Sequence, residues 1–387
     1  MEGDHIKVNK WLLPVSWFYG LGVRLRNKCF EWGVLKSRSF SIPIISVGNI
    51  TVGGSGKTPH VEYLIEMLKD KVRVAVLSRG YKRKSKGYQL ASPLSTVADI
   101  GDEPLQMKKK YPDIYIAVDA KRCEGIDRLT HDEETKDTDV ILLDDAFQHR
   151  YVKPGINILL VDYHRLIIYD KLLPAGRLRE PKEGKRRADM VIITKCPEGL
   201  NPIDFRVVMR AMDLYPYQTL LFSRMEYGKL RPLFSGDDRP LDSIGREEHV
   251  LSLTGIATPE QMEDDLRKYC SELTPMRFSD HHEFTAEDEE RINSVFESLP
   301  SPKLIITTEK DAARLASLTG LSEDVRHHLY VLPVKVSFLL DQEEIFMQKI
   351  FSYVQKNSRN SILATGKVDY KPKDSDRAGD RPRTISF

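Results

Sequence analysis

One stretch, Ser46 to His60, constrains the fold more than any other part of the sequence. It reads Ser-Val-Gly-Asn-Ile-Thr-Val-Gly-Gly-Ser-Gly-Lys-Thr-Pro-His and follows a β-branched apolar run at residues 42–47. Residues 61–69 then place leucine and isoleucine at helical spacing on one face. The succession of strand, glycine-rich loop and helix predicts the phosphate-binding corner of an α/β sheet.

The loop ends in Gly56-Lys57-Thr58, the residue types that a nucleotide phosphate requires. Glycines let backbone N–H groups curl around the anion, the lysine reaches the terminal phosphates, and the hydroxyl binds Mg²⁺. The strict spacing asks for glycine at position 51, where this chain has threonine, so a glycine-rich turn without a ligand is the alternative. The expected phosphate-binding residues are Thr51, Val52, Gly53, Gly54, Ser55, Gly56, Lys57 and Thr58.

A second apolar strand, predicted at residues 140–143, ends in Asp144-Asp145. Acidic residues at the carboxyl end of a buried strand are how phosphate-loop enzymes hold Mg²⁺ beside the loop hydroxyl. Two adjacent acids on a buried strand are costly unless a cation or hydrogen-bond donors satisfy them. The alternative is that Asp145 caps a helix.

Two further clusters carry carboxylates or imidazoles. Asp102 and Glu103 precede Pro104 in a tight turn, where a solvated loop is the competing interpretation. Residues 280–283 read Asp-His-His-Glu, and a metal site, a general-base pair and an exposed turn are all open for them.

The N-terminal segment, residues 11–35, holds all three tryptophans of the chain. Its longest apolar run is shorter than the ~20 residues that cross a bilayer. Phe18, Leu21 and Leu25 share one helical face and Arg24 and Lys28 the other, which predicts a helix lying in a membrane interface. A signal peptide is disfavoured because no small-residue cleavage site follows. A helix packed on the protein's own core remains the alternative.

Composition narrows the class of partner. A net charge of +2 among 30% charged residues gives no reason to expect nucleic acid. The four cysteines lie far apart in the sequence, which favours reduced thiols in an intracellular protein. Further apolar runs up to residue 307 predict a second α/β unit, and the polar residues 357–387 predict a disordered tail.

These motifs, in this order, resemble the family of bacterial tetraacyldisaccharide 4′-kinases, the lipid A 4′-kinases of lipopolysaccharide synthesis. A phosphate loop without glycine at position 51 is that family's own form, and Ala146 departs from it where glycine is usual. The motifs are residues 47–59, Ser78-Arg79-Gly80-Tyr81, Gly101-Asp102-Glu103-Pro104, residues 144–149, residues 176–181, Asp280-His281-His282 and Thr308-Glu309-Lys310-Asp311.

The resemblance implies ATP as co-substrate, Mg²⁺ as cofactor, and phosphorylation of the 4′-hydroxyl of a tetraacylated glucosamine disaccharide 1-phosphate. It implies peripheral attachment to the cytoplasmic face of the inner membrane, and no obligate protein partner is evident. An NTPase switch or metallochaperone without a lipid acceptor is the alternative. The implied fold is α/β, with two α/β/α sandwich domains of which the first is a P-loop NTPase-type parallel sheet. The expected division is a membrane-associated segment 1–40, a kinase domain 41–152 completed by helix 338–356, a second domain 153–337 and a tail 357–387.

The resemblance also assigns roles to single residues. The two residues that act together as the general base in that family correspond to Asp102 and His281 here. The family's metal ligands correspond to Thr58, Asp144 and Asp145. The candidates on the substrate or phosphate side are Arg79, Tyr81, Glu103, Arg122, Gln148, His149 and Glu180.

Overall fold

A nine-stranded sheet forms the core of the larger domain in the computed structural model, which describes residues 8–280 and 282–357. Its central strands run parallel and only the two edge strands pair antiparallel. In sheet order the strands are β14 (Val334–Phe338), β8 (Thr219–Tyr227), β7 (Met190–Thr194), β6 (Ile156–Asp162), β1 (Ile44–Gly48), β5 (Val140–Asp144), β2 (Val74–Ser78), β4 (Tyr115–Val118) and β3 (Gln89–Leu90).

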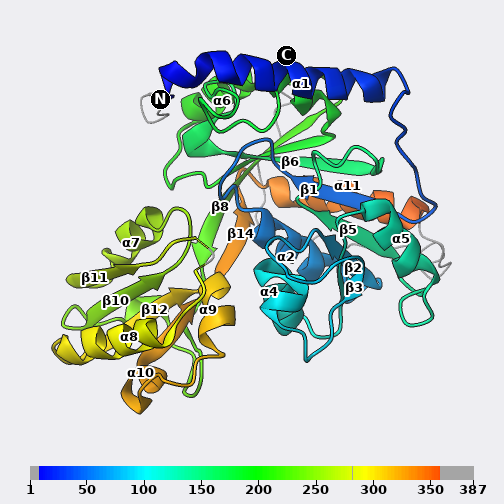
Figure 1. The fold of residues 1–387 in the computed structure, drawn as a ribbon. Helices are drawn as coiled ribbons and strands as arrows, with labels where there is room; N and C mark the ends of the chain where they lie inside the picture. The colour runs from blue at the N-terminus through cyan, green and yellow to red at the C-terminus, as the bar shows by residue number, and fades with distance from the viewer. Residues whose placement is uncertain (1–7, 281, 358–387) are drawn as a thin grey trace, which may run out of the picture.

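Helices cover both faces of this sheet, which is why its central strands are buried and mostly apolar (Figure 1). One face packs against α2 (Lys57–Leu68), α4 (Asp102–Lys110) and α11 (Gln342–Asn357), with the short α3 (Val97–Ile100) beside them. The other face packs against α5 (Arg122–His131) and α6 (Pro202–Met212). The arrangement confirms the predicted α/β class and the strand, loop and helix around residues 46–60.

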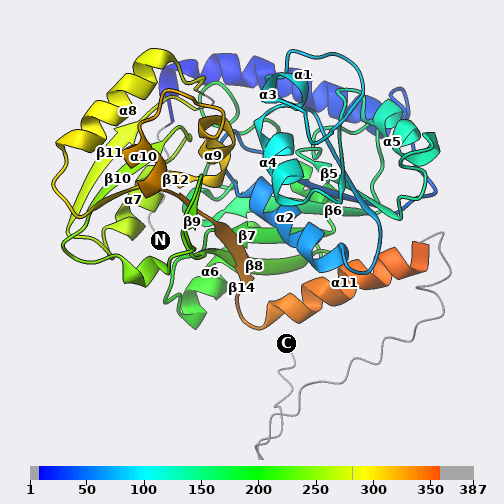
Figure 2. The ribbon, with the colours of Figure 1, turned by 90° about the horizontal axis from the view of Figure 1, so that it is seen from below.

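The smaller domain is built on a second, five-stranded sheet. Its strands are, in sheet order, β11 (Glu272–Arg277), β10 (His249–Thr254), β12 (Lys303–Thr308), β13 (Leu329–Leu332) and β9 (Arg231–Pro232). Its helices are α7 (Glu260–Leu266), α8 (Ala286–Ser298), α9 (Glu309–Leu315) and α10 (Glu323–His328). Figure 2 shows this domain beside the larger one, with α9 turned toward α4.

The boundary predicted at residues 152 and 153 does not coincide with the change of sheet. Strand β6 pairs with β1 in parallel register, Ile45 opposite Ile156, so residues 156–227 extend the first sheet. The reason is that an apolar run predicts a buried strand but not the sheet it joins. By sheet membership the smaller domain lies between β8 and β14.

Two short connections join the domains. The chain leaves the larger sheet after β8 and returns through Pro333, the residue between β13 and β14. The Gly228 N–H donates to the Pro333 carbonyl at 2.9 Å, which ties the two connections together. Away from this point the domains meet where Lys110 of α4 reaches Glu62 (2.5 Å) and Glu309 (2.8 Å).

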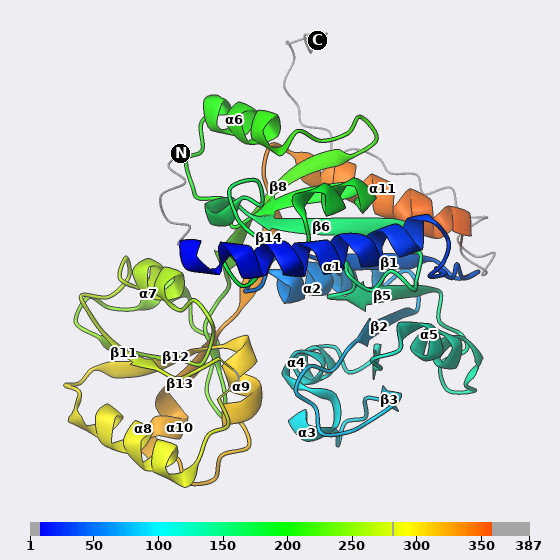
Figure 3. The ribbon, with the colours of Figure 1, turned by 45° about the horizontal axis from the view of Figure 1, so that its top comes forward.

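Helix α1 (Leu13–Glu31) lies along the outside of the larger domain (Figure 3). It rests on the protein through small residues: Ser16 is buried and donates to the Leu172 carbonyl at 2.9 Å, and Gly20 leaves room for the Leu172 side chain. Trp17, Phe18 and Leu25 are exposed. Helix α1 therefore packs on the protein through Ser16, Gly20 and the buried Phe30, while most of its large apolar side chains face away from the core. No helix in the described parts of the chain has both the length and the apolar character needed to cross a membrane.

Candidate functional site

A cavity of about 1110 Å³ opens at the carboxyl ends of β1, β2 and β5, between the two domains. The larger domain contributes the loop 51–58 and the paired aspartates. The smaller domain contributes residues 256–258, Asp280 and the start of α9. A site of this kind is expected where ligands bind in open α/β sheets.

The phosphate loop adopts a conformation that only glycine tolerates at its end. Gly56 has φ +80° and is the N-cap of α2, and a Cβ there would meet the Met225 methyl at 2.4 Å. Lys57 and Thr58 then form the first turn of α2, whose dipole favours an anion. The Val52 N–H donates to the Arg177 carbonyl at 2.8 Å, so the backbone N–H of this predicted phosphate ligand is already hydrogen-bonded within the protein.

A buried polar network fixes the loop from beneath. The Asn49 amide donates to Ser55 Oγ at 2.6 Å, and Asn49 accepts from the Arg179 guanidinium. The same guanidinium contacts both oxygens of Asp145, at 2.8 and 3.2 Å. The sequence analysis did not predict Asn49 and Arg179 as site residues. Both lie inside motifs shared with the family, residues 47–59 and 176–181, and that position could have identified them.

Asp144 and Asp145 are neighbours in sequence, but their pKa values are shifted in opposite directions. Burial, followed by the charges of Glu103 and Asp145, raises the pKa of Asp144 to about 7. Burial also opposes ionisation of Asp145, but Lys57 and Arg179 outweigh it and lower its pKa. Asp145 also has φ +46° and no helix follows it directly, so the alternative interpretation, a helix cap, is wrong.

The structure brings together around these aspartates most of the substrate-side candidates. Arg122 is buried at the start of α5 and directs one N–H to the Asp144 carbonyl at 3.4 Å. Burial, with Arg122 as the next cause, lowers the pKa of His149 to about 4, so this imidazole is neutral at pH 7. Arg79, Tyr81 and Glu103 line the same cavity.

Gln148 and Glu180 line the cavity but are tied to the protein. Gln148 donates to the Asn49 carbonyl at 2.6 Å and to Glu180 at 3.0 Å. Both carboxylate oxygens of Glu180 accept from Arg187 at 2.8 Å. These pairings give Glu180 a structural role in holding the loop that carries Arg179.

Asp102 lies against the opposite domain. The alternative interpretation of its turn, a solvated loop, required it to face solvent and is wrong. It is buried at the start of α4, with Oδ1 3.9 Å from Arg314 Nε of α9. Arg314 also donates to the His282 carbonyl at 2.7 Å. The His282 ring lies 2.8 Å from Asp288, while His281 lies outside the described residues. Sequence reasoning missed Arg314.

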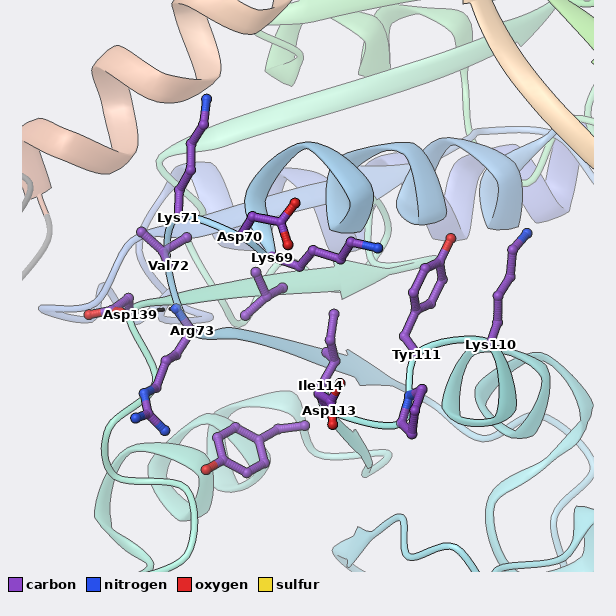
Figure 4. Close-up of a pocket in the computed structure, with 13 residues that line it drawn as sticks. Lys69, Asp70, Lys71, Val72, Arg73, Lys110, Tyr111, Asp113, Ile114 and Asp139 are labelled. Carbon is purple, nitrogen blue, oxygen red and sulfur yellow. Dashed lines mark hydrogen bonds between the residues drawn. The ribbon is translucent and has the colours of Figure 1, made fainter. Parts of the chain in front are cut away.

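A second hollow lies at the opposite, amino ends of β2, β4 and β5 (Figure 4). It measures about 610 Å³ and several lysines and an arginine line it. Arg73 pairs with Asp137 and Lys110 with two glutamates, so these cations are already neutralised. No cluster of three or more His, Cys, Asp or Glu side chains able to hold a metal occurs in the part of the chain that the structure describes.

The fold and the site define a phosphate-loop nucleotide-binding protein with a second α/β domain across the cavity. The comparisons are more specific. The sequence profile of the family described as Tetraacyldisaccharide-1-P 4′-kinase matches residues 8–355. The chain belongs to this family.

Individual relatives agree with that assignment. The tetraacyldisaccharide 4′-kinase of Phocaeicola vulgatus is 58% identical over 363 residues, covering 93% of this chain and 99% of the relative. That of Bacteroides thetaiotaomicron is 50% identical over 373 residues, covering 94% and 98%. A crystal structure of LpxK from Aquifex aeolicus in complex with ATP superposes with a TM-score of 0.68 at 30% identity, covering 89% of this chain and 98% of the other.

His60, in the first turns of α2, was not a predicted site residue but holds the end of the loop. Its Nδ1 lies 2.7 Å from the Gly56 carbonyl and its Nε2 lies 3.0 Å from Ser223 Oγ on β8. Because a carbonyl only accepts, Nδ1 carries the proton and Nε2 accepts from Ser223. Burial lowers the pKa of His60 to about 4.

This pKa generates a prediction about stability. Between pH 6.5 and 4 the unfolded chain binds more protons at His60 than the folded chain, so acid weakens the folded state by up to about 3 kcal/mol. In denaturant titrations at pH 7.0 and pH 4.5, His60→Gln should be destabilised at the higher pH and approach the wild type at the lower. An equal difference at both pH values would contradict the buried, neutral imidazole.

Proposed function

We propose that this chain binds ATP at residues 53–58 and transfers the γ-phosphoryl group to the 4′-hydroxyl of an acylated glucosamine disaccharide 1-phosphate. Membership in the family supports the reaction. The residue roles rest on one observation: the phosphate loop, the paired aspartates and the opposite domain all line the same cavity. At about 1110 Å³ this cavity is larger than the usual range of about 300–1000 Å³ for small-molecule pockets, which leaves room for a nucleotide and a sugar headgroup.

Lys57 and the first turn of α2 hold the β- and γ-phosphates in this proposal. The Lys57 ammonium lies 3.9 Å from Asp145 Oδ1, within the cavity and on the side of the aspartates. Arg122 and Arg79 add positive charge to the same cavity. Positive groups aimed at the transferring phosphoryl are what stabilise its spread-out negative charge.

Mg²⁺ fits beside Thr58, Asp144 and Asp145. Asp144 Oδ1 is buried and accepts no hydrogen bond from the residues that the structure describes. A hard cation with oxygen ligands would satisfy this oxygen, which is otherwise costly to bury. When bound, the ion would neutralise charge on the nucleotide phosphates.

Asp102 is the proposed base, with His281 of the smaller domain as its partner. The pKa of a sugar hydroxyl is far above 7, so a carboxylate accepts its proton late, as the bond to phosphorus forms. Arg314 of the smaller domain lies 3.9 Å from Asp102. A base completed by groups from the other domain works only when the domains are together, which limits idle ATP hydrolysis.

Helix α1 is the proposed attachment to the cytoplasmic face of the inner membrane. Its Trp17, Phe18, Leu21 and Leu25 side chains are exposed, and Arg24 and Lys28 are exposed beside them. The same helix lines the cavity with Tyr19 and Val23. A lipid acceptor could therefore keep its acyl chains in the bilayer while its headgroup enters the cavity.

The reaction has a direct test. The protein is mixed with ATP, Mg²⁺ and detergent-dispersed acylated disaccharide 1-phosphate, and the lipid product is analysed by mass spectrometry. We expect a doubly phosphorylated lipid, and Lys57→Met should lose it because the phosphates lose their cation. Release of inorganic phosphate with no phosphorylated lipid would favour the NTPase switch instead.

The base has a separate test. Asp102→Asn should lower kcat by roughly 10²-fold or more while ATP binding by calorimetry is retained, because only proton acceptance is lost. Asp113→Asn, an exposed carboxylate outside the cavity, is the control and should turn over normally. Full turnover by Asp102→Asn would remove Asp102 from this role.

The attachment is tested by flotation of the full chain with vesicles. Replacing Trp17, Phe18 and Leu21 together by serine should release the protein from vesicles, because burial of each side chain contributes roughly 1.5–3 kcal/mol. Its activity on detergent-dispersed lipid should persist. Undiminished vesicle binding would show that α1 is not the anchor.

A further inference from the structure

The outer side of α6 carries a pattern that the proposed function does not use. Phe205, Val208 and Met212 point into the core of the larger domain. Opposite them, at spacings of three and four residues, lies an exposed stripe that we call the α6 stripe: Ile203, Arg206, Val207 and Arg210. Ile203 is 65% exposed and Val207 is 42% exposed.

The α6 stripe interleaves two aliphatic side chains with two arginines and contains no acid. The loop that follows adds Tyr215 and Tyr217, both exposed, whose rings stack 5.6 Å apart. The Tyr217 hydroxyl donates to the Arg186 carbonyl at 2.6 Å, which holds this pair beside a basic segment, Lys182–Arg187. Aliphatic, aromatic and basic side chains on one outer surface are the composition that binds the headgroup region of an anionic bilayer.

The stripe lies on the same side of the molecule as α1. Helix α6 packs on one face of the nine-stranded sheet, and α1 rests on Leu172, which packs against that same core cluster. Arg186 and Glu31 at the end of α1 form an ion pair that joins the two regions. Figures 1 and 3 show α1 and α6 on this side of the sheet, with α6 set apart from α1.

We propose that the α6 stripe, with Tyr215 and Tyr217, is a second contact with an anionic lipid surface. The proposal rests on the proposed attachment through α1. A single helix lying on a bilayer leaves the protein free to tilt about the helix axis, whereas a second contact away from that axis fixes the tilt. A fixed tilt holds the cavity edge at Tyr19 and Val23 over the bilayer, where the headgroup of a lipid acceptor is presented.

The test uses the full chain and vesicles of phosphatidylglycerol mixed with phosphatidylcholine, with vesicles of phosphatidylcholine alone as a second arm. Arg206→Ala/Arg210→Ala should weaken binding to the anionic vesicles about 25-fold, because each basic side chain near such a surface contributes about a factor of five. Ile203→Asp/Val207→Asp should weaken binding to both kinds of vesicle.

The matched control is Leu340→Asp/Ile345→Asp, beside and on α11, which packs on the opposite face of the sheet. These side chains are 59% and 45% exposed, close to the values for the stripe. The control should bind vesicles like the wild type, and all variants should keep the wild-type melting temperature and activity on detergent-dispersed lipid.

The outcomes separate the two membrane claims. Weaker binding by both stripe variants with an unaffected control supports the second contact. Wild-type binding by the stripe variants, while the α1 variant is released, overturns the second contact and keeps the anchor. Equal weakening by stripe and control variants also overturns it, because the loss would then follow from added charge anywhere on the surface.

Discussion

The arrangement of the site depends on how nearby cations compensate the negative charge of Asp144 and Asp145 at the end of β5. Asp144 is fully buried and Asp145 is partly buried, and burial of charge without partners is among the largest costs in a folded protein. Lys57 and Arg179 lower the pKa of Asp145, while Asp144 is left with its pKa raised to about 7. The cations therefore come from the phosphate loop and from a segment far along the chain, which ties the loop to the aspartates.

The phosphate loop is also held in place by hydrogen bonds from side chains, in addition to the conformations that its glycines allow. Arg179 reaches Asn49 as well as Asp145, and Asn49 holds Ser55 from within. His60 fixes the Gly56 carbonyl to Ser223 of β8. A loop held at both ends presents its amides without first having to order them, which reduces the entropy cost of binding an anion.

The proposed base, Asp102, lies on the larger domain, and its neighbour Arg314 lies on the smaller one. A few contacts connect the two domains around this pair. Gly228 and Pro333 join the domains on one side, and Lys110 bridges Glu62 and Glu309 on the other. Asp102 lies near this bridge, on α4, so opening the domains would separate it from Arg314. In the proposed mechanism, nucleotide binding, completion of the base at Asp102 and approach of the two domains are therefore coupled through a few side chains.

The sequence by itself determined the local features of this protein: the strand, loop and helix around Lys57, the strand that delivers Asp144 and Asp145, and an N-terminal helix with large apolar side chains. These follow from residues close in sequence, where periodicity and turn chemistry are read directly. Only the tertiary structure decided that β6 to β8 extend the first sheet, that Arg179 neutralises Asp145, and that α1 rests on Ser16 and Gly20 with Trp17 and Phe18 outward. Each of these depends on contacts between residues distant in the chain, such as His60 with Ser223, and no local pattern specifies which distant partner a side chain will meet.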